Sequence, residues 1–121
     1  MTNKKTLILG ATTDATRYAY LAAERLCGSG HSIINVGLKT GTVAGGLIEM
    51  PKVIYTDIDT ITLYVNPEKQ QSLYKYILKT NPKRIIFNPG TENPELQKLA
   101  NQQGITTEYA CTLVLLSLGQ Y

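Results

Sequence analysis

A chain of 121 residues with a net charge of +3 has the length of a single globular domain. Hydrophobic residues make up 43% of it and charged residues 17%, which is ordinary for a soluble protein. The positive excess is too small for the basic footprint of a nucleic-acid-binding protein, and it is compatible with an anionic small molecule as ligand.

The cysteines and the apolar runs indicate the cellular compartment in which the protein is expected. Cys27 and Cys111 form no CxxC pair and His31 is the only histidine, so neither a disulfide framework nor a zinc site is expected. The apolar run near the start is too short for a secretory signal, and the late run at residues 110–119 is too short to cross a bilayer. We therefore expect a cytoplasmic protein with reduced thiols and with neither membrane nor nucleic acid among its partners.

Short apolar runs alternate with helical patterns along the chain. Residues 6–10 predict a buried strand that ends in a turn, and residues 15–27 predict a helix whose apolar side chains fall on one stripe. Asp14 is the expected N-cap of this helix, and Gly28 with Gly30 its end.

The middle of the chain continues the alternation. A second strand is expected at residues 32–37 and a glycine-rich loop at residues 39–46. Residues 47–56 are interpreted as a short irregular or extended piece beside the sheet edge. A third strand follows at residues 60–65, and then a helix at residues 67–80 with Asn66 as its cap.

The last third of the chain adds two more strands. Residues 84–88 predict a fourth strand, residues 94–104 a short helix, residues 105–110 a fifth strand and residues 111–119 a buried helical turn or two. Alternation of strand and helix is typical of a parallel sheet with helices on both faces, joined by right-handed crossovers. The predicted class is therefore a three-layer α/β fold that forms one domain over residues 1–121.

The fold class itself indicates where a ligand would bind. In open parallel sheets, ligands bind beyond the carboxyl ends of the strands. This rule selects residues 10–13, 37–39, 65–67, 88–91 and 109–112.

The first of these segments has the properties of a phosphate site. Gly10 permits a tight turn and a close approach of the backbone to a ligand. Ala11 follows, and then the backbone amides of Thr12, Thr13 and Asp14 at a helix start, together with the two threonine hydroxyls, are suitable donors to a phosphate. Arg17 lies about one turn further and can add positive charge. The alternative is a plain strand–turn–helix joint.

The dinucleotide fingerprint G-x-G-x-x-G is only partly met. Gly10 matches its first position, but Thr12 replaces the second glycine. The second strand ends in Asn35, Gly37 and Lys39 and lacks the acidic residue that binds the ribose of NAD. A lysine there favours a ribose with an additional phosphate, as in coenzyme A or NADP; a solvated loop lysine is the alternative.

Two other strand ends carry Asn–Pro pairs. Asn66 and Pro67 end the third strand, and Asn88, Pro89 and Gly90 end the fourth. Each asparagine can cap the segment that follows, and each proline stiffens the turn. The two pairs are consistent with the floor of a shaped cleft, or with a structural role alone.

Cys111 follows the fifth strand at the start of an apparent helix, where backbone amides favour a thiolate. A reactive thiol there can form a mixed disulfide with a thiol cofactor; the favoured alternative is a small buried apolar residue. The sequence offers no Ser-His-Asp arrangement, no metal-ligand spacing and no Walker motif, so we predict no catalytic residues and no metal ligands.

Together these residues resemble the stand-alone coenzyme A-binding domain family, which is similar to the N-terminal domain of the succinyl-CoA synthetase alpha subunit. Gly10-Ala11-Thr12 matches the family's Gly-Ala-Ser turn, and Arg17-Tyr18 a basic or aromatic pair in its first helix. A glycine loop at residues 42–46 and Cys111 follow in the family's order. Asn35-Val36-Gly37 departs from the family, which usually has Asn-Pro there. The resemblance covers nearly the whole chain.

The resemblance implies a Rossmann-like fold with five parallel strands in the order 3-2-1-4-5. It also implies coenzyme A or an acyl-CoA as cofactor, lying across residues 10–13 with its adenosine end toward Gly37 and Lys39. The residues expected to bind it are Gly10, Ala11, Thr12, Thr13, Arg17, Tyr18, Gly37, Lys39, Asn66, Pro67, Asn88, Pro89, Gly90 and Cys111.

The resemblance supplies no catalyst, because the synthetase works through a phosphohistidine domain and a partner subunit that have no counterpart in this sequence. The leading hypothesis is a small protein that binds coenzyme A or an acyl-CoA without turnover. The alternatives are an NADP-type enzyme or enzyme subunit and a regulatory or scaffolding protein. Tyrosines on the predicted helices are compatible with a homodimer.

Overall fold

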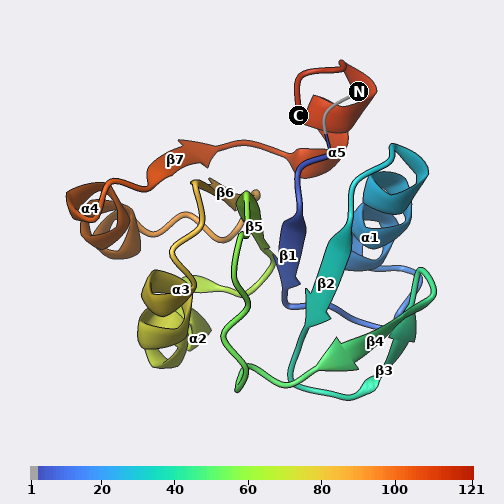
Figure 1. Ribbon diagram of the computed structural model, residues 1–121, viewed down its shortest axis with the longest axis horizontal. Coiled ribbons are helices and arrows are strands. Elements are labelled where there is room, and N and C mark those ends of the chain that lie inside the picture. Colours follow the sequence, from blue (N-terminus) through green and yellow to red (C-terminus); the bar gives the residue numbers. More distant parts are fainter. Residues whose placement is uncertain (1–2) are drawn as a thin grey trace.

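The computed structural model describes residues 3–121 and contains one seven-stranded sheet in the order β3-β4-β2-β1-β5-β6-β7 (Figure 1). Every neighbouring pair of strands is parallel except β3 with β4. The strands are β1 (Thr6–Leu9), β2 (Ile33–Val36), β3 (Gly41–Val43), β4 (Gly46–Glu49), β5 (Thr60–Leu63), β6 (Arg84–Phe87) and β7 (Thr106–Tyr109). The predicted α/β class is confirmed, and the sheet has more strands than predicted.

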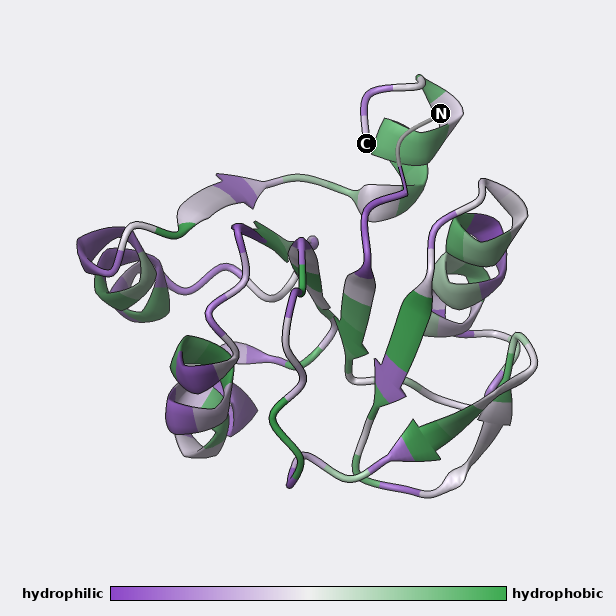
Figure 2. Ribbon diagram, in the orientation of Figure 1, coloured by the Kyte–Doolittle hydropathy of each residue, from purple (hydrophilic) through white to green (hydrophobic). Residues whose placement is uncertain are grey.

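Helices cover both faces of the sheet because successive residues of each buried strand point to opposite sides. Leu7 and Leu9 of β1 pack in one hydrophobic cluster and Ile8 packs in the other. The apolar colouring of the central strands in Figure 2 reflects this burial on both faces. The first cluster includes side chains of α3 (Tyr74–Thr80) and α4 (Pro94–Gln102), and the second includes side chains of α1 (Tyr18–Gly28) and α5 (Thr112–Ser117).

The predicted strand order 3-2-1-4-5 is wrong. β5, the predicted third strand, pairs with β1 along its whole length, from Thr6 with Thr60 to Leu9 with Leu63. On its other side from β1, β2 pairs with β4, a segment of the sequence in which no strand was predicted. The five predicted strands therefore run in the order 2-1-3-4-5 within the sheet.

The predicted glycine-rich loop is a β-hairpin formed by β3 and β4. Val43 pairs with Gly46, and the two residues between them, Ala44 and Gly45, have φ angles of 50° and 77°. Two successive positive φ values give a turn whose twist matches that of the flanking strands. Asn35 of β2 is buried and donates from Nδ2 to the carbonyl oxygen of Val43 at 3.2 Å, which holds the hairpin against the sheet.

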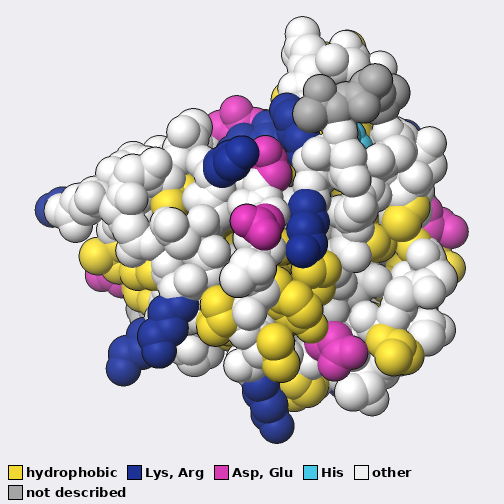
Figure 3. Space-filling view, in the orientation of Figure 1, with side chains coloured by type: hydrophobic (Ala, Val, Ile, Leu, Met, Phe, Trp, Pro, Cys, Tyr) yellow, Lys and Arg dark blue, Asp and Glu magenta, His cyan; other side chains and the backbone are white. Residues whose placement is uncertain are grey.

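The piece interpreted as irregular, residues 47–56, contains most of β4 and the exposed loop that follows it. Leu47, Val53 and Ile54 are exposed apolar side chains from this region. Figure 3 shows hydrophobic side chains gathered on the lower centre of this face of the molecule, with Lys and Arg side chains near them. This apolar surface lies where Figure 1 places the loop that follows β4.

The first helix begins later than predicted, so Asp14 is not its N-cap. α1 begins at Tyr18, with Arg17 in the cap position and no capping by a side chain. Asp14 instead accepts hydrogen bonds from the amide and the hydroxyl of Thr16, at 2.9 and 2.6 Å. Short polar side chains compete with helical bonding in this way. The predicted end of the helix, at Gly28, is confirmed.

The helix predicted at residues 67–80 is divided into three parts. These are α2 (Pro67–Gln70), a 3-10 turn (Gln71–Leu73) and α3. The predicted cap is confirmed, because Oδ1 of Asn66 accepts the amide of Lys69 at 3.0 Å. Asn93 caps α4 in the same way. Within residues 3–121, no helix combines the length and the apolar character needed to cross a lipid bilayer.

His31 is buried at the amino end of the sheet, next to Tyr121. The two rings lie 5.0 Å apart, and Nδ1 of His31 accepts the backbone amide of Lys4 at 2.9 Å. Burial lowers the pKa of His31 below its ordinary value, the positive charges of Lys4 and Arg84 also lower it, and Asp59 raises it. The folded protein therefore favours the neutral imidazole.

Acidification is expected to reduce the free energy of unfolding through His31. The unfolded chain, with an ordinary histidine pKa of about 6.5, takes up a proton before the folded protein does. Stability should therefore fall as the pH drops through about 6.5 and level off below the lowered pKa of the folded state. Urea unfolding at pH 8 and pH 5 should show a larger loss for the wild type than for His31→Asn, which retains an acceptor that does not titrate. An equal loss in both proteins would assign the pH dependence to other groups.

Candidate functional site

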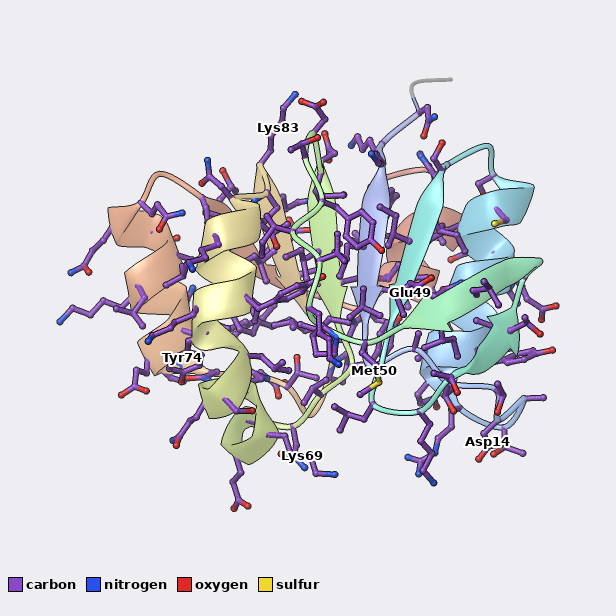
Figure 4. The ribbon with its side chains drawn as sticks, turned by 60° about the horizontal axis from the view of Figure 1, so that its bottom comes forward. Asp14, Glu49, Met50, Lys69, Tyr74 and Lys83 are labelled. Atoms are coloured by element: carbon purple, nitrogen blue, oxygen red, sulfur yellow. The ribbon has the colours of Figure 1, made fainter. Side chains whose placement is uncertain are left out.

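A cleft of about 660 Å³ opens at the carboxyl ends of β1, β2, β5 and β6. This volume falls in the range of roughly 300–1,000 Å³ that is usual for small-molecule sites. In Figure 4, Asp14 and Lys69, which follow β1 and β5, lie at one edge of the molecule, and Lys83, which precedes β6, lies at the other. β2 and β5 flank β1, and helices on opposite faces of the sheet follow β1 and β5, so the cleft occupies the topological switch point.

Most of the residues predicted to bind a cofactor line this cleft. They are Gly10, Ala11, Thr12, Thr13, Arg17, Tyr18, Lys39, Asn66, Pro89 and Gly90. Four others do not line it: Gly37, Pro67, Asn88 and Cys111. Other residues also line the cleft: Leu38, Val65 and Thr91 belong to segments that the sequence selected as ligand-binding strand ends, and Asp14, Ala19, Tyr64 and Lys69 do not.

The turn after β1 is held against the end of β2. The amides of Gly10 and Ala11 both donate to the carbonyl oxygen of Val36, at 2.8 and 3.0 Å. Gly10 has a φ of 104°, and a Cβ there would lie 3.0 Å from the carbonyl carbon and oxygen of Tyr64. Glycine is therefore required both for the backbone conformation and for the space.

Gly37 is buried behind this turn instead of facing the cleft. Its amide donates to the carbonyl oxygen of Glu49 at 2.9 Å. A Cβ at Gly37 would lie 2.5 Å from the carbonyl oxygen of Ala11. Its position at a strand end is as predicted, but the structure gives it the role of allowing β2 and the turn to approach each other.

The amides available to a phosphate are not all those predicted. Because α1 begins at Tyr18, the first amides without an intrahelical partner belong to Tyr18 and Ala19, which both line the cleft. The amide of Asp14 donates to Oγ1 of Thr12 at 3.1 Å and so is used within the turn. The cleft therefore combines Thr12, Thr13 and the positive end of the helix dipole of α1.

Three cationic side chains line the cleft, against one carboxylate. The cations are Arg17, Lys39 and Lys69, and the carboxylate is Asp14. Nε of Arg17 lies 3.7 Å from the Asp14 carboxylate in an exposed ion pair. Hydrogen bonds from Thr16 lower the pKa of Asp14, and the charge of Arg17 lowers it further. The cleft is thus net positive, which favours an anionic ligand.

Lys69 was missed from the sequence, although a signal for it exists. Arg17 holds the cap position of α1, the helix that follows β1, and Lys69 lies in the first turn of α2, the helix that follows β5. Asn66 marks that helix start in the sequence through its predicted capping role. A search for cations in the first turn of each predicted helix that follows a strand would have selected Lys69 together with Arg17.

Asn88 is buried and joins three elements. Its Nδ2 donates to Oγ1 of Thr62 at 2.7 Å and to the carbonyl oxygen of Leu63 at 2.8 Å. Its Oδ1 accepts the amide of Thr112, at the start of α5, at 2.9 Å. These bonds direct the side chain into the fold, so Asn88 positions the two cleft residues that follow it instead of lining the cleft itself.

Pro67 and Cys111 occupy helix starts outside the cleft lining. Pro67 is the first residue of α2, where its fixed φ suits the helix and its missing amide costs no hydrogen bond. Cys111 precedes α5 and is partly buried. A mixed disulfide between Cys111 and a thiol cofactor stays a prediction. Over residues 3–121, no three His, Cys, Asp or Glu side chains are grouped so that they could hold a metal ion.

The protein is thus a doubly wound α/β domain with a net-positive cleft at its topological switch point, where ligands of this fold class bind. The chain belongs to the CoA binding domain family, whose model matches residues 4–117. The resemblance drawn from the sequence is therefore confirmed.

Several solved structures share the fold of this chain. A crystal structure described as an uncharacterized protein is 53% identical, with 100% of each chain covered and a TM-score of 0.97. A hypothetical protein from Pyrococcus horikoshii is 25% identical over 93% of this chain and 80% of that chain, with a TM-score of 0.81. A Thermus thermophilus protein, 18% identical over 98% of this chain and 91% of its own, shares the fold with a TM-score of 0.83. No curated protein matches the sequence.

Proposed function

We propose that the protein binds coenzyme A or an acyl-CoA in the cleft at the carboxyl ends of β1, β2, β5 and β6. The net-positive lining of the cleft, with Arg17, Lys39 and Lys69 against Asp14, carries the proposal within a chain of this family. Coenzyme A has a diphosphate and a separate 3′-phosphate, so it offers negative charge at two positions along an extended molecule. Binding, without turnover by this chain alone, is the function proposed.

The features of the cleft support one orientation of the ligand. The diphosphate would lie across residues 10–13, where the hydroxyls of Thr12 and Thr13 and the start of α1 supply donors. The 3′-phosphate would lie near Lys39, on the β2 side. The pantetheine arm would then run along the opposite wall, which includes Val65 and Gly90.

Coenzyme A is expected to raise the melting temperature of the protein more than NAD or NADP does at the same millimolar concentration. A ligand that binds only the folded state at one hundred times its Kd stabilises it by about 2.7 kcal/mol, or about 10 °C for a domain of this size. Differential scanning fluorimetry with coenzyme A, dephospho-coenzyme A, NAD and NADP measures this directly. A larger shift with NADP would favour an NADP-binding protein, and no shift with coenzyme A would contradict the proposal.

A further inference from the structure

One buried side chain joins the two loops that form the wall of the cleft opposite β2. Gln70, the last residue of α2, is 0% exposed. Its Nε2 donates to the carbonyl oxygen of Val65 at 2.7 Å and to that of Thr91 at 2.8 Å. Val65 follows β5, Thr91 follows β6, and both line the cleft. A single amide group therefore sets the separation of two cleft-lining loops.

A second set of hydrogen bonds fixes the orientation of this amide. Oε1 of Gln70 accepts Nδ2 of Asn93 at 2.9 Å. The same Nδ2 donates to the hydroxyl of Tyr74 at 2.9 Å, and that hydroxyl donates to Oε1 of Glu95 at 2.9 Å. Reversing the Gln70 amide would set an oxygen against two carbonyl oxygens, so only one orientation satisfies the network.

The placement of these bonds distinguishes Gln70 from an ordinary packing residue. Glutamine is rarely buried completely, and burying its amide is unfavourable unless it is hydrogen-bonded. An apolar side chain would pack α2 against the sheet without this requirement. The Gln70 amide instead donates to the backbone carbonyl oxygens of Val65 and Thr91. These two residues lie more than twenty positions apart in the sequence, and both line the cleft.

We propose that Gln70 is a positioning residue for the ligand, which holds the Val65 and Thr91 loops at the separation that accepts the pantetheine arm. The inference rests on the proposed function and on the orientation that directs the adenosine end toward Lys39. The opposite part of the cleft, residues 10–13, is held separately by the bonds of Gly10 and Ala11 to Val36. Loss of the Gln70 amide should therefore weaken binding of one half of the ligand and leave the other half unaffected.

Gln70→Met tests this, because methionine keeps the length of the side chain and removes its donors. The matched control is Gln103→Met: Nε2 of Gln103 also donates to two oxygens, the carbonyl of Leu78 at 2.7 Å and Oδ1 of Asn81 at 2.9 Å, and it does not line the cleft. Isothermal titration with coenzyme A and with adenosine 3′,5′-bisphosphate, well below each melting temperature, separates the two halves of the ligand.

Gln70→Met is expected to weaken coenzyme A binding by about tenfold and to change binding of the bisphosphate by less than about twofold. Gln103→Met should leave both affinities unchanged. Gln70→Asn keeps an amide on a side chain too short to reach both carbonyl oxygens. It should lose less affinity for coenzyme A than Gln70→Met and should likewise bind the bisphosphate as the wild type does. This variant replaces Gln70→Met in the test if the methionine variant does not fold.

The outcomes separate the two proposals. If the wild type binds neither coenzyme A nor the bisphosphate, the proposed function fails. If the wild type binds coenzyme A, the proposed function stands. The positioning role of Gln70 is then overturned if the Gln70 variants keep their affinity for both ligands, or lose affinity for both to the same extent.

Discussion

Gly37→Ala is expected to destabilise the protein by about 1–3 kcal/mol and to weaken coenzyme A binding. The added Cβ would lie 2.5 Å from the carbonyl oxygen of Ala11 and 3.1 Å from Cγ2 of Ile48. The first contact is with backbone that is held in place through the amide of Ala11 and the carbonyl oxygen of Val36. Relief of the clash therefore requires the turn that lines the cleft to move, so stability and affinity should fall together. Urea unfolding and calorimetric titration measure the two effects.

Gly28→Ala is the matched control for this substitution. A Cβ at Gly28 would meet nothing within 4 Å, and the residue lies in the last turn of α1, where alanine is the better helix former by up to about 1 kcal/mol. This variant should be neutral or slightly more stable and should bind coenzyme A as the wild type does. A Gly37→Ala protein as stable as the wild type would show that the turn can shift freely.

Thr12→Asp is expected to weaken coenzyme A binding by at least about tenfold at low ionic strength. The substitution introduces a negative charge into the cleft where the diphosphate is proposed to lie. The turn should survive, because an aspartate oxygen can replace the Thr12 hydroxyl as acceptor of the amide of Asp14, a bond of 3.1 Å. The loss of affinity for coenzyme A should become smaller as salt is added, because salt screens exposed charges.

Thr12→Asn separates the effect of the added negative charge from the effect of the changed side-chain shape. Its side chain has nearly the size of aspartate, keeps an acceptor oxygen and is neutral. It should bind coenzyme A much better than Thr12→Asp, and titrations at two salt concentrations should show the difference. Equal affinities for the wild type and both variants would place the phosphates elsewhere in the cleft.

The sequence was sufficient to predict the central strands, because β1 and β6 contain short continuous apolar runs and β5 alternates threonine with isoleucine and leucine. The hairpin was not predictable from the same signal. β3 and β4 have three and four residues, and their turn places the non-glycine residue Ala44 at a φ of 50°. The strand order 3-2-1-4-5 was implied by the family resemblance, and it placed the third predicted strand beside β2, where the structure has β4.

The location of the cleft could also be predicted, because parallel strands bring their carboxyl ends to one edge. The direction in which each side chain points could not be predicted from the sequence. Asn88 turns inward because its partners, Thr62 and Thr112, come from distant parts of the chain. Gln70 was not selected from the sequence, and only the contact between α2 and the loop after β6 shows that it is buried.

The bond between Thr112 and Asn88 has a consequence for the order in which the molecule can be assembled. Thr112 contributes its amide to Asn88 and its hydroxyl to Thr62, at 2.8 Å, so the start of the last helix completes the support beneath Pro89 and Gly90. During synthesis, the turn after β1 emerges from the ribosome nearly a hundred residues before Thr112 does. One wall of the cleft can therefore form early, and the other reaches its final shape only after all the strands of the sheet have been made. A nascent chain would gain its ligand affinity late.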